Sequence, residues 1–243
     1  MKIAIDAGHG YNTPGKRTPD GSMREWEFNN AVALLVKPLL ESYKGVTVKL
    51  THDTTGKTDV PLKTRTDTAN AWGADVLVSI HANAAGNGWS TAHGIETFVY
   101  TSIKAGSETY KLAENVNTAI VKATGLANRG VKQGDLHMVR ETHMPAILVE
   151  CGFMSNKTEA ALLKSADYRK KVAQAIVDGL AKTYGLTKGA TEVANTNDSK
   201  PSIWAKEAWT KATKAGVVDG ARPQDGLTRE EFTVIIDRLG LLK

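Results

Sequence analysis

Apolar runs of strand length alternate with amphipathic segments along most of the chain. The runs KIAID, VTVKLT, ADVLVSIHAN, GIETFVYT and PAILVECGF have the length of strands, and several end at glycine or another turn residue. The segments between them, including WEFNNAVALLVKPLLESY and YRKKVAQAIVDGLAKTYG, repeat apolar positions at helical spacing. This order predicts an α/β fold with a mixed, mostly parallel sheet flanked by helices.

The pattern changes after the helix that ends in TYG. The next segment, TKGATEVANTNDSKPS, is polar and without sustained periodicity, as is typical of a linker. Beyond it, IWAKEAWTKATKAG has an amphipathic helical pattern, and a capping box of Thr228 and Glu231 begins a second helix. We expect three parts: a main domain over residues 1–186, a linker over 187–200 and a small, mainly helical module over 201–243.

Composition and charge exclude several classes of protein. Hydrophobic residues make up 41% and charged residues 23% of the chain, which is close to average globular usage and argues against a disordered, fibrous or membrane-embedded protein. The formal net charge of +5 favours encounter with anionic polymers. Basic residues are interspersed with acidic ones and form no long run, so we do not expect nucleic acid as partner. No stretch approaches the roughly 18 apolar residues of a membrane helix, and we do not expect a membrane as partner either.

Polar side chains that can bind a metal follow three of the predicted strands: His9 in DAGHG, His81 in SIHAN and Glu150 in VECGF. Each histidine taken alone is also compatible with an ordinary structural role. The carboxyl ends of strands converge in α/β folds, and Glu25 or Glu27 is available to complete such a site. Because the single cysteine excludes a thiolate site, a metal here must use imidazole and carboxylate ligands, a set typical of zinc.

Four motifs, DAGHG, Glu25-x-x-x-Asn29, SIHAN and VECGFMSN, occur in this order and resemble those of the type 3 N-acetylmuramoyl-L-alanine amidases. The resemblance spans about residues 1–186 and identifies this part as a zinc amidase catalytic domain. It implies cleavage of the amide between N-acetylmuramic acid and L-alanine in peptidoglycan. Alternatives are a zinc peptidase that cuts the stem peptide and a non-catalytic cell-wall-binding protein.

The resemblance also implies a role for individual residues. It implies that His9, Glu25 and His81 hold Zn²⁺, and that Glu150 is the catalytic glutamate. Glu27 remains the alternative to Glu25, which the spacing to Asn29 favours.

Other polar residues near the motifs have weaker predictions. Asn83 follows His81 by two residues on the same side of the strand, so we expect it to contact substrate. Arg65 is expected to be a surface ion-pair partner on its helix. Alternation along the strand directs Cys151 away from the face that carries Glu150, which predicts a packing role for the thiol.

The C-terminal module loosely resembles an S-layer homology repeat, a resemblance that implies binding to a secondary cell-wall polymer. Only one copy is visible, and about forty residues make a marginal core, so self-association is a further expectation. The apolar run before Asp6 is shorter than the core of a signal peptide, about 7 to 15 residues. We therefore expect synthesis in the cytoplasm and action on the wall after release, as for a phage endolysin, with an autolysin secreted by another route as the alternative.

Overall fold

The computed structural model describes residues 1–189 and 206–217 of the chain. The chain divides into two compact units, Met1–Lys188 and Gly189–Lys243. In the second unit the described residues include the helix α7, Lys206–Lys214. Most of the predicted linker and the capping box of Thr228 and Glu231 lie outside the described residues. No helix within the described ranges is long and apolar enough to cross a membrane.

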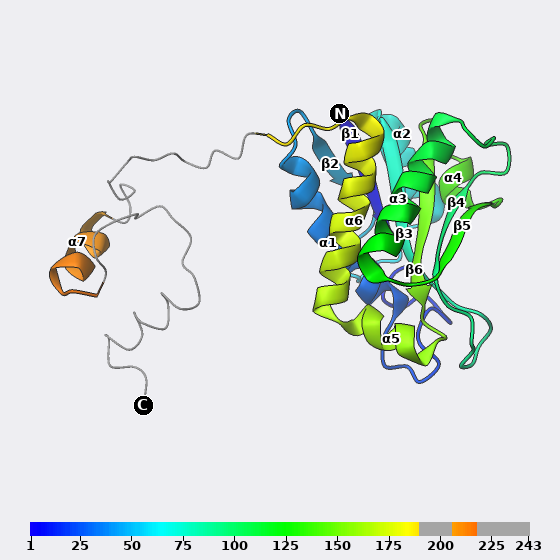
Figure 1. Ribbon diagram of the computed structural model, residues 1–243, viewed down its shortest axis with the longest axis horizontal. Helices are drawn as coiled ribbons and strands as arrows, with labels where there is room; N and C mark the ends of the chain where they lie inside the picture. The colour runs from blue at the N-terminus through cyan, green and yellow to red at the C-terminus, as the bar shows by residue number, and fades with distance from the viewer. Residues whose placement is uncertain (190–205, 218–243) are drawn as a thin grey trace. The chain divides into compact units, whose positions relative to one another are not determined.

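The first unit contains a six-stranded sheet with the order β2-β1-β3-β6-β4-β5 (Figure 1). Its strands are β1 Lys2–Ala7, β2 Thr47–Leu50, β3 Val76–Asn83, β4 Ile95–Val99, β5 Asn128–Gln133 and β6 Ala146–Phe153. All neighbouring strands are parallel except β4 and β6, which are antiparallel. The mixed, mostly parallel sheet predicted from the sequence is confirmed.

The helices of this unit are α1 Glu25–Glu41, α2 Leu62–Trp72, α3 Glu108–Thr124, α4 His137–Arg140, α5 Lys157–Lys164 and α6 Ala166–Tyr184. The sequence pattern did not predict β5, α4 or α5. The β5 sequence NRGVKQ is polar because the strand lies at the edge of the sheet, and α4 is a single turn, too short for a visible periodicity.

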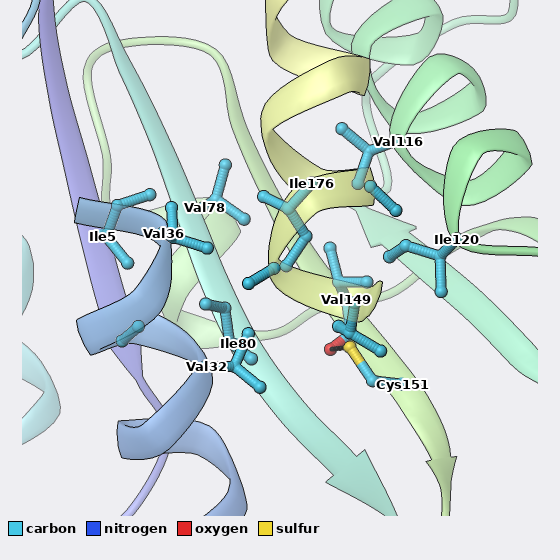
Figure 2. Packing of buried hydrophobic residues seen from close by; sticks show 14 of the residues in the cluster. Ile5, Val32, Val36, Val78, Ile80, Val116, Ile120, Val149, Cys151 and Ile176 are labelled. Atoms are coloured by element: carbon cyan, nitrogen blue, oxygen red, sulfur yellow. Dashed lines mark hydrogen bonds between the residues drawn. The ribbon is translucent and has the colours of Figure 1, made fainter. Parts of the chain in front are cut away.

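One face of the sheet packs against α1, α3 and α6, and Figure 2 shows this core from close by. Val32 and Val36 of α1, Val116 and Ile120 of α3, and Ile176 of α6 meet strand residues that include Ile5, Val78, Ile80 and Val149. Cys151 belongs to the same fully buried cluster, which confirms its predicted packing role. Burying this apolar area is the main source of stability for the unit.

The other face packs against the shorter helices α2 and α4 through a smaller apolar cluster, which includes Ala4, Leu77 and Leu148. Further along each strand, the side chains on this face become polar: Ala4 is followed two residues later by Asp6, Leu148 by Glu150, and Leu77 by Ser79 and then His81. The sheet therefore presents Asp6, His81 and Glu150 on one face, toward the carboxyl ends of β1, β3 and β6.

Candidate metal and catalytic site

The turn after β1 places His9 beside His81. Among the described residues, His9 is the one non-glycine residue with a positive φ, 64°, a sparsely populated conformation that clusters at functional sites. Gly8 precedes it, and a Cβ atom there would lie only 2.1–2.5 Å from three atoms of the His81 ring. Glycine is therefore required for the close approach of this turn to His81.

Glu25 joins the two histidines. It is the first residue of α1 and is 2% exposed. Its Oε2 lies 3.3 Å from His9 Nε2, and its Oε1 lies 3.0 Å from His81 Nδ1. The Ala82 backbone N–H and the Asn29 side-chain amide also donate to Oε1, at 3.2 and 3.3 Å. These donors and the helix N-terminus hold a negative charge at this point.

Protonation in this cluster suits cation binding. Burial raises the pKa of Glu25, but the hydrogen bond from His81 and the charges of both histidines outweigh it and lower the pKa to about 2. Burial lowers the pKa of His9 to about 4 against the opposing charge of Glu25. Burial disfavours the protonated form of His81, but the hydrogen bond to Glu25 and the charge of Glu25 outweigh burial and raise the pKa of His81. The space between these two side chains therefore favours a positive charge.

The donor set fits zinc. His9, Glu25 and His81 each offer one ligand atom, and these atoms lie within 4.8 Å of one another. Tetrahedral zinc with bonds of about 2.0–2.1 Å separates its ligands by about 3.4 Å, close to the separations of 3.0 and 3.3 Å between Glu25 and the two imidazoles. Glu27, the alternative ligand, instead accepts the backbone N–H of Arg24 at 2.6 Å.

Glu150 lies next to this cluster, because its strand position pairs with His81 in the β3–β6 register. Its Oε2 is buried and has no hydrogen-bond partner among the described residues. Burial raises the pKa of Glu150 to about 8, with the charges of Glu25 and Glu96 adding to the rise and that of His81 opposing it. A buried carboxyl group without a partner is costly, and one that titrates near neutral pH can accept and donate a proton.

Arg65 forms ion pairs, as predicted, but its predicted position on the surface was wrong: the side chain is 1% exposed and supports the turn that carries His9. Its Nη1 donates to Asp6 Oδ1 at 3.0 Å and to the Ala7 carbonyl at 2.5 Å, while its Nη2 donates to the His9 carbonyl at 2.9 Å. Asp6 is itself fully buried, and Ser79 and Thr51 also donate to it. The signal in the sequence was the position of Arg65 four residues before Ala69, on the buried stripe of α2.

Asn83 lies at the end of β3, where its amide donates to Glu96 Oε1 at 2.7 Å. Its predicted contact with substrate stays a prediction. Glu96 was missed in the sequence, although the alternation of β4 places it on the same face as Phe98, and Phe98 packs against the smaller apolar cluster.

Two imidazoles and a carboxylate that can hold a metal ion, next to a carboxyl group with an unpaired buried oxygen, form the kind of site that metal-dependent hydrolases use. Comparison with known proteins defines the family. Residues 3–182 match the model of the family described as N-acetylmuramoyl-L-alanine amidase, and the chain belongs to this family. The family predicted from the four motifs is confirmed.

Two curated relatives illustrate the similarity. The chain is 36% identical over 190 residues to the N-acetylmuramoyl-L-alanine amidase CwlM of Bacillus licheniformis, which covers 78% of this chain and 71% of the relative. It is also 36% identical over 205 residues to the endolysin of Bacillus phage SPP1, which covers 82% of this chain and 72% of the relative.

A solved structure supports the fold. The catalytic domain of CwlV, an N-acetylmuramoyl-L-alanine amidase from Bacillus (Paenibacillus) polymyxa var. colistinus, superposes with a TM-score of 0.70 at 36% identity. The match covers 77% of this chain and 99% of that domain.

Proposed function

We propose that this chain is a zinc-dependent enzyme that hydrolyses the amide bond between N-acetylmuramic acid and L-alanine in bacterial peptidoglycan. The observation that carries the proposal is the convergence of His9, Glu25 and His81 next to Glu150. Membership of the amidase family supports the choice of bond.

His9, Glu25 and His81 would hold the zinc ion, and the Asn29 amide keeps the Glu25 carboxylate in place. When bound, zinc supplies Lewis acidity, which polarises a carbonyl group and makes water more acidic. The buried Arg65 fixes the backbone of the turn that carries His9, so that this ligand is held in position before metal binds.

Glu150 is the proposed general base and acid. Its unpaired Oε2 accepts a proton from the water that attacks the scissile carbonyl, and it returns this proton to the departing amino group of alanine. Proton donation to the amine is essential, because an amide nitrogen leaves readily only as a neutral amine. The raised pKa of Glu150 makes both transfers accessible near neutral pH.

The deciding experiment is digestion of purified peptidoglycan with and without a metal chelator, followed by identification of the new amino termini. New N-terminal alanine that disappears with the chelator and returns with Zn²⁺ is the expected result. Other new amino termini would identify a peptidase that cuts within the stem peptide. Binding to walls without any new terminus would identify a non-catalytic wall-binding protein.

We also propose that the enzyme acts as a phage endolysin, made in the cytoplasm and acting on the wall after release. Similarity to the endolysin of Bacillus phage SPP1 supports this role, and similarity to the bacterial amidase CwlM supports the alternative of an autolysin. Production inside a bacterial host should leave cells intact until the membrane is permeabilised and should then cause rapid lysis. Lysis without permeabilisation would favour a chain that reaches the wall by its own route.

For the C-terminal unit we propose binding to a secondary cell-wall polymer, with self-association of the chain. The support is the sequence pattern of residues 201–243, most of which lie outside the described residues. Walls should retain the full-length chain, and chemical removal of the secondary polymer should release it. Light scattering of the purified chain tests self-association directly.

A further inference from the structure

A second polar cluster lies beside Glu150 on the same face of the sheet. Because β4 runs antiparallel to β6, β4 begins at the edge where β3 and β6 end. Glu96, near the start of β4, pairs with Glu150 in this register. Glu96 is therefore one strand away from the proposed general base, and β5 lies one strand further.

Glu96 is the centre of the cluster and is 5% exposed. Its Oε1 accepts the Asn83 amide at 2.7 Å. Its Oε2 lies 2.6 Å from Arg129 Nε and 2.7 Å from Lys132 Nζ, and both of these residues belong to β5. The buried carboxylate thus fixes two cationic side chains from the edge strand.

The two cations exceed what Glu96 needs for neutralisation. One carboxylate facing one guanidinium and one ammonium leaves an excess of one positive charge, and the side chains of Arg129 and Lys132 are 35% and 39% exposed. The Arg129 guanidinium lies 4.9 Å from the centre of the Phe153 ring and donates through Nη1 to the His93 carbonyl at 3.4 Å. Its Nη2 has no hydrogen-bond partner among the described residues.

Such a pair is suited to an anion. Arg129 is oriented by the ring of Phe153 and by its Nε bond to Glu96, which leaves the outer edge of its guanidinium available. Lys132 uses one of its three Nζ donors on Glu96. An arginine held in this way, with a lysine beside it, has the geometry and charge to bind a carboxylate.

We propose that Arg129 and Lys132 form a subsite that binds a carboxylate of the stem peptide, with Glu96 and Asn83 as positioning residues. The proposal rests on the function proposed above, in which the leaving group is a peptide that begins with alanine. Its second residue, a γ-linked D-glutamate, carries a free α-carboxylate in unmodified peptidoglycan. Arg129 and Lys132 lie two strands from Glu150, about 10 Å at the usual strand spacing, and their side chains reach back to Glu96 on the strand between. This is the region that the second residue of the leaving peptide would occupy.

The test is equilibrium binding of L-alanyl-γ-D-glutamyl-L-lysine to the full-length, zinc-loaded chain, compared with the same peptide amidated at the glutamate α-carboxylate. The wild-type chain should bind the acid about ten-fold more tightly than the amide, since a charge-assisted hydrogen bond contributes about that much. Arg129→Gln and Lys132→Gln should each reduce this preference, while Arg129→Lys should retain part of it.

Arg140→Gln is the matched control. Arg140 is also 35% exposed and paired with two acidic residues, but it lies in α4, before β6 begins. This variant should keep the full preference for the acid. Thermal unfolding of each variant separates loss of the fold from loss of the subsite.

Equal binding of the two peptides to the wild-type chain, or no binding of either, would overturn the subsite. An equal loss for both peptides in Arg129→Gln and Lys132→Gln would also overturn it, because it would show a structural role. The release of N-terminal alanine from peptidoglycan is measured separately. Release without acid preference removes the subsite alone, whereas acid preference without release contradicts the proposed reaction.

Discussion

The two faces of the sheet differ in what holds them together. The face against α1, α3 and α6 is built from a large apolar cluster, whereas the face against α2 and α4 has a small apolar cluster followed by charged and polar groups. On the second face, the buried ion pair of Arg65 and Asp6 joins α2 to β1, whereas on the first face apolar side chains join the helices to the sheet. The apolar packing and the polar site thus lie largely on opposite sides of the same strands. The adjacent residues Glu150 and Cys151 show this, because Cys151 packs in the apolar cluster and Glu150 faces the polar site.

The largest effect is expected from Glu150→Ala, a change on the polar face that should affect activity and not stability. The variant should lose at least about 100-fold in amide hydrolysis, the usual contribution of general acid–base catalysis, and should keep its metal. Glu150 Oε2 is buried without a hydrogen-bond partner among the described residues, so removing this side chain should not lower the free energy of unfolding. Turnover assays with metal analysis check both points, and near-normal turnover would remove Glu150 as the base.

His81→Ala is the companion variant. It should lose both bound zinc and activity, because it removes one of the three proposed ligands. A variant that retained stoichiometric zinc would contradict the ligand set.

The second-largest effect is expected from Arg65→Met. Loss of the guanidinium leaves Asp6 buried without its cation and releases the carbonyl groups of Ala7 and His9, so the free energy of unfolding should fall by about 3–5 kcal/mol. Urea denaturation measures this change. Lys63→Gln on the same helix removes an exposed pair with Asp67 and should change nothing measurable. Equal free energies of unfolding for the two variants would mean that the ion pair between Arg65 and Asp6 does not stabilise the polar face.

On the apolar face, Ile176→Ala should lower the free energy of unfolding by about 2–5 kcal/mol, because it leaves a cavity among fully buried side chains. Activity of the folded fraction should be unchanged, in contrast to Glu150→Ala. Denaturation and turnover measured on the same preparation test this. A large loss of turnover at full folding would show that the two faces are coupled.

The smallest effect is expected from Ser107→Ala. The Ser107 hydroxyl caps α3 by accepting the Tyr110 N–H at 3.3 Å, and its loss should cost about 1 kcal/mol. Zinc content and turnover should stay at the wild-type level. Thermal unfolding detects the change, and an unaltered midpoint would show that the cap contributes little.

The sequence predicted the apolar face well because burial leaves a periodic pattern. KIAID and ADVLVSIHAN became β1 and β3, and the long amphipathic segments became α1 and α6. It missed β5, since an edge strand that carries Arg129 and Lys132 has no apolar repeat. A helical turn such as α4 is too short to show one.

For the site, the strand ends indicated His9, His81 and Glu150, because these residues interrupt or follow apolar runs. The burial of Arg65 was not predicted, since its partners are the backbone carbonyls of a distant turn and Asp6, fifty-nine residues away. The position of Glu96 beside Glu150 was likewise not predicted, because it depends on the pairing of β4 with β6, and the pattern along one strand does not show which strands pair.

The position of β6 bears on how the chain is made. β3 and β4 follow one another in the sequence, yet β6 lies between them in the sheet and is the last strand to be synthesised. Until residue 153 has left the ribosome, β2-β1-β3 and β4-β5 are two separate fragments, and joining them requires a pairing between distant parts of the chain. The same strand brings Glu150, so a nascent chain has neither a continuous sheet nor its proposed general base until most of the first unit has been synthesised.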